Sequence, residues 1–434
     1  MTTLFTNVTA LLMDETFTTL RGGYVAVDGT QISYVGPDRP AGNFDETIDC
    51  TGKVMMPGFV NCHTHIPMTL MRGYGGGHNL QEWLNDFIFP AEAKWDDRAI
   101  AAATGLGLAE MIASGVTCIA DMYMRTGVIA RQVLDAGISA NLSVGGVYFG
   151  DPEDFSPDKC GDCANQKALT EEWHMAGDGQ IMADASIHAE YTSNAPLWQW
   201  MADYAQAHNL RMHVHVSETH LEHMNCIEKY GITPTQVLDR YGVWQNGGIA
   251  AHCVYLSGGD AQLLAERGVT AVHNPVSNLK LMSGVAPLFF LRDCGMNVAL
   301  GTDGVSSNNS HNMFEEMKVA ALTQNYHFGE DHGLLSAMDI LAMATVNGAT
   351  ALHRNTGVIA PGKAADLILV DFTAPNLIPC HDEAENLVFS ACGSNVWMNM
   401  ARGKVIYRNG EFLTLDLEKI KAEVKQYALP LIFH

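Results

Sequence analysis

Four short segments place residues of metal-ligand type at the ends of predicted strands. Each segment is a β-branched or aliphatic run that stops where a loop begins, so separate strands would carry these side chains to one rim. Imidazole and carboxylate groups gathered in this way indicate a hydrolase that uses one metal ion. The residues are His63 and His65 in PGFVNCHTH, His215 in RMHVHVSET, His252 in IAAHCVY and Asp303 in VALGTDG.

The spacing of His63 and His65 suits binding to one cation. On a strand, residues i and i+2 project from the same face, so both imidazoles can reach the ion while Thr64 points away. Two such rings, a third histidine and a carboxylate form a ligand set for Zn²⁺ or Fe²⁺ that leaves room for a water. An isolated H-x-H pair is a weak signal, because buried histidine is often structural. The matching context of the other segments favours the metal site.

The order of the elements indicates an α/β fold. Eight strand candidates, from FVNCHTH to NVALGTD, alternate with helical segments, one of which runs from Asp96. This alternation is typical of a (β/α)8 TIM-type barrel, whose chemistry lies at the C-terminal rim. His213 shares a face with His215 but lies one layer deeper, so we assign it to the core. The other strand ends carry Asp121, Gly145, His188 and His273.

Both ends of the chain read as β structure. Residues 1–57 alternate apolar and polar side chains around a predicted hairpin turn at Asp28-Gly29, and a second turn is predicted at Asn409-Gly410. After the last barrel strand, helical stretches are predicted over 311–324 and 336–352. We therefore expect a small, discontinuous β-sandwich domain from residues 1–57 and 355–434, the latter including a C-terminal tail, around a barrel of residues 58–354.

The composition of the chain limits the kinds of partner that it is expected to bind. The chain of 434 residues has 48 acidic and 25 basic residues and a formal net charge of −23, which disfavours nucleic acid and anionic membranes. No apolar run reaches the ~18 residues of a membrane span, and the N-terminus lacks the pattern of a signal peptide, so a cytoplasmic location is expected. The ten cysteines are scattered, and we interpret Cys160-Gly-Asp-Cys163 as a loop feature without an assigned role.

The motifs as a set resemble the amidohydrolase superfamily, and within it the methylthioadenosine/S-adenosylhomocysteine deaminase branch. The similarity extends over nearly the whole chain, from HTHIPMTLMRGYG and LQEWLNDFIFPAEAK to HNPVSNLKL and GVIAPGKAADLILVDF. It implies a metal held by His63, His65, His215 and Asp303, with Glu218 as proton shuttle and His252 as the group that orients water. It also implies that Trp83, Glu92 and His188 contact the substrate.

The chemistry of these residue types agrees with the resemblance. A divalent metal brings the pKa of a bound water towards ~7. The expected reaction is attack of this hydroxide on the amino-bearing carbon of a 6-aminopurine nucleoside, with release of ammonia. Asp303 would take a proton from the water, and Glu218 would pass one to the adjacent ring nitrogen. A carboxylate such as Glu92 can accept hydrogen bonds from both hydroxyls of a ribose.

The resemblance also favours one metal over two. Two-metal members of the superfamily carry a modified lysine at the end of the fourth strand, where this sequence reads ASIHAEYT and has His188. We expect one divalent metal per chain, with Zn²⁺ first and Fe²⁺ or Mn²⁺ compatible with the same ligands. Relatives of this kind often form dimers or tetramers, so a homo-oligomer is expected.

The segment after the third strand departs from the family pattern. Members that use S-adenosylhomocysteine carry arginines there for the amino-acid carboxylate, whereas residues 143–167 contain none. Adenosine and methylthioadenosine are therefore favoured over the homocysteine compound. Two alternatives stay open: a different amidohydrolase reaction, such as triazine dechlorination or deamination, or guanine deamination, and a non-catalytic relative. The presence of all four ligands disfavours the second, and Glu92 disfavours a free base.

Overall fold

Eight parallel strands form the central barrel of the computed structural model, which describes residues 1–433, with side chains except at positions 331 and 332. They lie in two hydrogen-bonded sheets, joined on one side by a bridge between Gly146 and Ile187 and on the other by the Asp303 amide, which donates to the His63 carbonyl (2.9 Å). The barrel strands are β6 (Phe59–Thr64), β7 (Val116–Met122), β8 (Ser139–Ser143), β10 (Ala185–Ala189), β11 (Met212–Val216), β12 (Gly248–His252), β13 (Val269–His273) and β14 (Val298–Leu300), with β9 (Ile181–Ala183) directly before β10.

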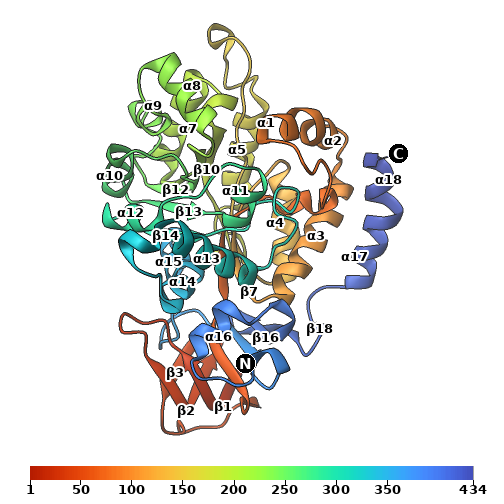
Figure 1. Cartoon of the computed structure of the whole chain (residues 1–434). Helices are drawn as coiled ribbons and strands as arrows, with labels where there is room; N and C mark the ends of the chain where they lie inside the picture. The colour runs from red at the N-terminus through yellow and green to blue at the C-terminus, as the bar shows by residue number, and fades with distance from the viewer. Residues whose placement is uncertain (434) are drawn as a thin grey trace.

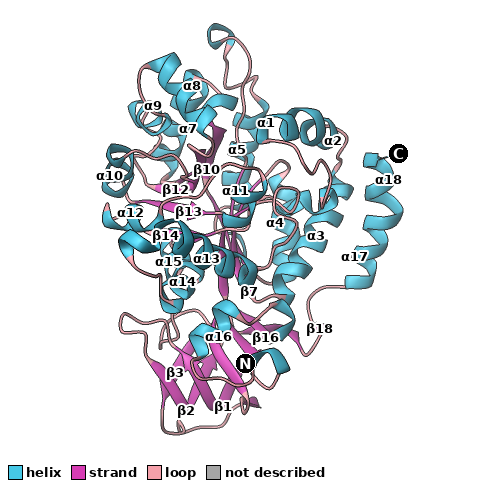
Figure 2. Ribbon diagram, in the orientation of Figure 1, coloured by secondary structure: helices cyan, strands magenta, loops and turns pink. Residues whose placement is uncertain are grey.

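Helices surround the barrel and cover the outer faces of its strands (Figure 2). The helices cover the outer face of each strand, and side chains of the barrel interior cover the inner face. Almost every barrel-strand residue is therefore buried, as expected of a parallel sheet. The helices of this region are α1 (Leu80–Glu82), α2 (Phe89–Glu92), α3 (Asp97–Ala113), α4 (Thr126–Ala136), α5 (Gly161–Trp173), α6 (Ala176–Gly179), α7 (Ala195–His208), α8 (His220–Tyr230), α9 (Pro234–Arg240), α10 (Gly258–Glu266), α11 (Pro275–Lys280), α12 (Leu288–Asp293), α13 (Met313–His332), α14 (Ala337–Ala344) and α15 (Val346–Ala351).

A third sheet, outside the barrel, joins the two ends of the chain below it (Figure 1). Strand β5 is its link, because it pairs with β1 on one side and with β15 on the other. Apolar side chains from both ends share a second hydrophobic core, which includes Phe5, Val25, Leu367 and Met398. The strands are β1 (Thr2–Leu11), β2 (Thr19–Asp28), β3 (Gln31–Gly36), β4 (Glu46–Asp49), β5 (Lys53–Pro57), β15 (Leu367–Asp371), β16 (Val396–Ala401), β17 (Lys404–Arg408) and β18 (Glu411–Phe412).

The remaining helices follow β15. Helix α16 (Glu383–Phe389) precedes β16. Helix α17 (Leu417–Glu423) lies beside α3, and α18 (Leu429–Phe433), which contacts α2, ends the described chain (Figure 1). None of the described helices combines the length and apolar character that a membrane-crossing segment needs.

The turn predicted at Asn409-Gly410 and the helix predicted from Asp96 are confirmed. The first hairpin turn lies one residue later than predicted, at Gly29-Thr30, because Asp28 still pairs with Gln31. Gly29, Asn409 and Gly410 have φ values of 57°, 50° and 87°, as tight hairpin turns between antiparallel strands require. Helix α3 begins after Asp96, whose carboxylate accepts from the amide of Ala99 (2.9 Å).

The bounds of the helices after the barrel were wrong. The helix predicted to end at residue 324 continues to residue 332, where Gly333 with φ 79° ends it. The next stretch is broken at Thr345 (φ −133°, ψ −92°) into α14 and α15.

The Cys160-Cys163 segment is not a loop. Cys160 lies at the N-cap of α5 and Cys163 lies in its first turn, and both are buried, free cysteines.

Candidate active site

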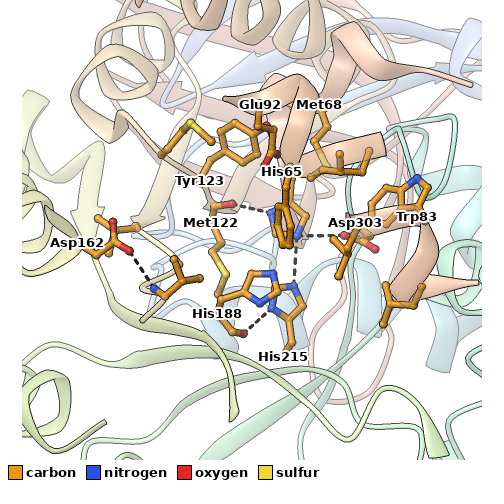
Figure 3. A pocket seen from close by; sticks show the side chains of 18 of the residues that line it. His65, Met68, Trp83, Glu92, Met122, Tyr123, Asp162, His188, His215 and Asp303 are labelled. Carbon is orange, nitrogen blue, oxygen red and sulfur yellow. Dashed lines mark hydrogen bonds and ion pairs between the residues drawn. The ribbon is translucent and has the colours of Figure 1, made fainter. Parts of the chain in front are cut away.

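The four predicted ligands converge at the C-terminal ends of β6, β11 and β14. Figure 3 shows three of them, His65, His215 and Asp303. Nε2 of His65 lies 3.3 Å from Nε2 of His215 and 3.3 Å from Oδ1 of Asp303. Nε2 of His63 lies 3.4 Å from the same carboxylate oxygen. All four side chains are buried, so residues 240 positions apart in the sequence meet at one point of the barrel mouth.

The residues present fit a divalent metal ion. Nε2 of His63 is fully buried and has no hydrogen-bond partner within residues 1–433. Burial lowers the pKa of His63 to about 4, so its ring is neutral at pH 7 and offers a lone pair. Burial also favours the neutral form of His65, but the hydrogen bond and charge of Asp303, the backbone contact with Met122 and the charge of Asp121 together outweigh it and raise the pKa to about 9. The cluster therefore favours a positive charge beside the Asp303 carboxylate.

In two of the histidine ligands, the ring nitrogen that faces away from the ligand cluster, here called the outer nitrogen, is held by a backbone carbonyl. Nδ1 of His65 donates to the carbonyl of Met122 (2.6 Å), and Nδ1 of His215 donates to the carbonyl of His188 (2.7 Å), as Figure 3 shows. Each proton placement leaves Nε2 free to act as a ligand.

Asp121 anchors the turn that carries the His63-Thr64-His65 sequence. Its Oδ1 accepts from the Thr64 hydroxyl (2.8 Å) and from the amide of Ile66 (2.7 Å). The sequence identified Asp121 only as a strand end. In the pairing of β7 with β6, Asp121 lies opposite Thr64. The sequence does not show this, because it depends on the register of the two strands.

Glu218 and His252 lie beside the ligands and face one another. Oε2 of Glu218 lies 3.6 Å from Nε2 of His252, and both side chains are buried. Burial raises the pKa of the Glu218 carboxyl, which favours its protonated form and suits a group that donates a proton. The backbone at Glu218 is held by Glu222, whose carboxylate accepts from the Glu218 amide (2.8 Å) at the start of α8.

The segment around α11 orients three of these groups. Asn278 accepts from Nδ1 of His252 (2.8 Å), Ser283 donates to Glu218 (2.8 Å) and Ser277 donates to Asp303 (2.6 Å). Because Nδ1 of His252 carries the proton, its Nε2 is a free acceptor at the cavity. The sequence motif HNPVSNLKL was used only for the family resemblance, and these three contacts were not foreseen.

His252 and Asp303 also share an unusual backbone. Their φ values are 75° and 61°, in the left-handed region that non-glycine residues rarely adopt. Such conformations persist where the surrounding structure holds them, and they cluster at functional sites. Both residues turn out of a barrel strand directly into the cavity.

The predicted substrate contacts line the same cavity of about 480 Å³ as Glu218, His252 and Asp303. Trp83 lies at the start of the short π-helix η2 (Trp83–Ile88), Glu92 lies at the end of α2 and His188 lies in β10. The remaining wall is largely apolar and includes Leu80, Leu84, Ile88, Phe89, Val147 and Phe149. One cavity thus offers a flat aromatic surface, a carboxylate and the ligand cluster.

Tyr123 is a polar residue of this cavity that the sequence analysis missed. Its hydroxyl donates to Oε1 of Glu92 (2.5 Å), and Figure 3 shows the two side chains together above His65. Burial raises the pKa of the Glu92 carboxyl to about 7, and the hydrogen bond from Tyr123 opposes that rise. The available signal was the strand alternation, which puts Tyr123 two residues beyond Asp121 on the same face.

The cations near the cavity are already paired. Arg125 lines the cavity, but its guanidinium donates to Asp97 and to the carbonyl of Trp95. Arg72 donates to Glu110 and to the carbonyl of Asn309 and does not line the cavity.

Comparisons with known proteins show the family of this chain. The 5'-deoxyadenosine deaminase of Methanothermobacter thermautotrophicus is 40% identical over 94% of both chains. The 5-methylthioadenosine/S-adenosylhomocysteine deaminase of Pelotomaculum thermopropionicum is 39% identical over 99% of this chain and 98% of its own. The crystal structure of an adenosine deaminase from Xanthomonas campestris with bound zinc is 32% identical and covers 99% of this chain and 98% of its own, with a TM-score of 0.91. Residues 54–406 match the amidohydrolase family, to which this chain therefore belongs.

Proposed function

We propose that this protein is a metal-dependent hydrolytic deaminase of 6-aminopurine nucleosides. The observation that carries the proposal is the shared cavity, in which the Glu92 carboxylate lies in the same apolar pocket as the ligand cluster, Glu218 and His252. The relatives named as deaminases of adenosine-type compounds, similar over almost the full chain, support it.

His63, His65, His215 and Asp303 would hold the metal. When bound, a divalent ion supplies Lewis-acid chemistry that makes a water molecule acidic enough to react near pH 7. The unpartnered Nε2 of His63 and the low pKa of Asp303, kept ionised by its histidine partners despite burial, support this ligand set.

The remaining steps belong to side chains. Nε2 of His252 accepts a hydrogen bond from the attacking water and aims it at the amino-bearing carbon. Asp303 takes a proton from that water, and Glu218 gives its proton to the ring nitrogen beside the carbon. The proton held by Asp303 then passes to the amino group, the bond between the ring carbon and this nitrogen breaks, and ammonia leaves. The hydroxyl proton on the same carbon returns to Glu218 as the carbonyl of the product forms. The raised pKa of Glu218 supports its role as the proton donor.

Ribose recognition is assigned to Glu92 and Tyr123. The Tyr123 hydroxyl occupies Oε1 of Glu92 and favours the ionised carboxylate, which can accept from the two ribose hydroxyls. Trp83 would pack on the nucleoside, and His188, held by Thr192 (3.1 Å), would face it from the opposite strand.

We further propose that the 5′ substituent is neutral. Val147 and Phe149 line the cavity where the third-strand segment passes it, and the charged residue that this segment contributes is Asp162. Its carboxylate accepts from the amide of Val147 (2.9 Å). A carboxylate tail would meet no free cation there.

A homo-oligomer, either a dimer or a tetramer, is also proposed. Leu322 and Tyr326 on α13 are 51% and 86% exposed, and Leu334 just beyond it is 74% exposed. Contiguous exposed apolar side chains are typical of association surfaces. Sedimentation equilibrium measures the state directly.

A deamination screen tests the proposed function. Adenosine, 5′-deoxyadenosine, methylthioadenosine, S-adenosylhomocysteine, guanine and a chlorotriazine are supplied to the zinc-loaded protein, and ammonia or chloride release is followed. We expect the neutral nucleosides to have the highest kcat/KM. Faster turnover of guanine or of the triazine would overturn the proposal, and so would the absence of turnover of every compound.

A further inference from the structure

His213 is a buried histidine without a role in the reaction just described. It lies in β11, two residues before His215, so both side chains point into the barrel from one face. Its Nε2 lies 2.8 Å from Nδ1 of His63, and the two rings meet edge to face at 5.0 Å. His213 therefore contacts one proposed metal ligand while sharing a strand with another.

This contact distinguishes His63 from the other histidine ligands. His65 and His215 donate their outer N–H to backbone carbonyls, which are acceptors whatever the surrounding side chains are. The outer nitrogen of His63 meets another imidazole, which can be either a donor or an acceptor. The proton on His63 is thus set by a side chain, which makes it sensitive to substitution.

The direction of the hydrogen bond follows from the ligand geometry. Nε2 of His63 points at the cluster and must offer a lone pair, so the ring proton is on Nδ1, which donates to His213. His213 then accepts at Nε2 and carries its own proton on Nδ1, 3.3 Å from the Ser143 hydroxyl. Ser143 in turn donates to the carbonyl of Asp121 (3.4 Å). With this assignment, each N–H or O–H from His63 through His213 to Ser143 faces one acceptor, and no two donors face each other.

The chain of contacts crosses the barrel interior beneath the cluster. His63, Ser143 and His213 come from β6, β8 and β11, which are the first, third and fifth barrel strands. Alternate strands of such a barrel contribute one layer of inward side chains. Such a layer is normally packed with aliphatic residues. Here it contains a chain of hydrogen-bonded polar side chains whose last member is the proposed metal ligand His63.

We propose that His213 is a positioning residue that fixes the tautomer and ring orientation of His63 for metal binding. The inference rests on the proposed metal site and adds a residue that determines its affinity. Partners of this kind keep a ligand ring aligned and raise its basicity, and their loss commonly weakens metal binding by about 10- to 100-fold.

Zinc affinity of three variants tests the proposal. His213→Leu removes the acceptor, whereas the side-chain oxygen of His213→Gln can still accept from His63. His273→Leu is the matched control, because His273 is equally buried at a barrel-strand end and neither of its ring nitrogens has a hydrogen-bond partner within residues 1–433. Zinc dissociation constants are measured by competition with a chromophoric chelator, and the thermal unfolding of each metal-free variant is recorded alongside.

We expect His213→Leu to bind zinc about 10- to 100-fold more weakly than wild type, with His213→Gln between the two and His273→Leu equal to wild type. Equal zinc affinity in His213→Leu and His273→Leu would overturn the inference. A wild-type protein that binds no zinc would overturn the metal site itself, which separates the two failures.

A measurement on the wild type covers the case in which His213→Leu does not fold. In the zinc-loaded, ¹⁵N-histidine-labelled protein, the signals missing from His213→Gln identify His213. We expect a neutral ring with its proton on Nδ1. A proton on Nε2, or a doubly protonated ring, would contradict the proposal.

Discussion

At Glu218, burial and placement combine to give a proton carrier that is not a ligand. Its carboxylate faces His252 and is held by Ser283, so replacing it leaves the ligand cluster intact. We expect Glu218→Gln to lower kcat by about 10²- to 10⁴-fold, because the amide cannot carry the proton. Zinc content and the Kd for a nucleoside should stay close to wild type.

Glu190→Gln is the control for this prediction. Glu190 and Glu218 are each 4% exposed, and Glu190 does not line the cavity, so the control reports the cost of changing a buried carboxyl alone. If the Glu218→Gln variant keeps more than about a tenth of the wild-type kcat, Glu218 is not the general acid.

Tyr123 should act on ribose and not on the base. Tyr123→Phe removes the hydrogen bond to Glu92 without changing the shape of the wall. The loss of a hydrogen bond to a charged group predicts a rise of about tenfold in KM for adenosine, with kcat nearly unchanged. The KM for 2′,3′-dideoxyadenosine, which lacks the hydroxyls, should not change. An equal effect on both compounds would indicate a purely structural role.

The same carboxylate predicts a pH dependence. Burial raises the pKa of Glu92 to about 7, and only the ionised form accepts from both hydroxyls. As the pH falls through 7, Glu92 gains a proton and the KM for adenosine should rise, whereas above this range KM should be flat. Steady-state kinetics of wild type and Glu92→Gln between pH 5.5 and 9 measure this, since the variant lacks the titrating group. A wild-type profile that stays in Glu92→Gln would assign the titration to another group.

The residues that the sequence could identify are those whose type alone limits their chemistry. Histidine and aspartate at strand ends have few roles, so residue type gave five candidates, His252 among them. The resemblance to the family then selected His63, His65, His215 and Asp303 as the ligands. A tyrosine can serve many purposes, and the role proposed for Tyr123 depends on its hydrogen bond to Glu92, 31 residues away in the sequence. His213 was assigned to the core correctly as to depth, but its contact with His63 crosses the barrel between strands that are not neighbours.

At the scale of elements, the segment between β8 and β9 decides which 5′ substituents the cavity accepts. It brings Phe149 and Asp162 to the wall, and Arg125 nearby is paired with Asp97. A homocysteine carboxylate would lose its water without gaining a charged partner, which costs about 1.5 to 3 kcal/mol. We expect kcat/KM for methylthioadenosine to exceed that for S-adenosylhomocysteine by roughly 10- to 150-fold.

Asp97→Ala offers a second test of the same prediction, because it frees the guanidinium of Arg125. Use of S-adenosylhomocysteine should then improve relative to methylthioadenosine. Equal use of both compounds by the wild type would show that Arg125 leaves Asp97 to bind the tail.

Element order was predictable because its signal is local. Short, largely apolar strands of three to seven residues that lead into polar side chains identified the barrel and its rim, since a parallel strand is buried on both faces. The end of α13 and the start of α5 were not predictable, because both lie in polar stretches where burial against neighbouring elements decides. Cys163 is fully buried in a segment that reads as a surface loop.

At the scale of the whole molecule, one sheet joins both ends of the chain. Strand β15 lies between β16 and β5, so the C-terminal part completes a core begun by residues 1–57. This pairing supports the proposed division into a barrel of residues 58–354 and a small domain from residues 1–57 and 355–434. Turn signals and alternation predicted the strands, whereas the pairing order across 300 residues needed the structure.

The metal itself should hold the whole barrel together. Its ligands come from β6, β11 and β14, so an ion that binds the folded state joins strands from opposite sides of the barrel. Binding at a free concentration about 1,000-fold above Kd contributes on the order of 4 kcal/mol to folding. We expect the zinc-loaded protein to contain one metal per chain by elemental analysis, and chelation to abolish turnover and lower Tm. Zn²⁺ should restore both properties, whereas Mg²⁺ should restore neither, because it prefers oxygen ligands and an octahedral shell. Two metals per chain, or a Tm that chelation leaves unchanged, would mean that these four residues do not form the single metal site on which the proposed chemistry depends.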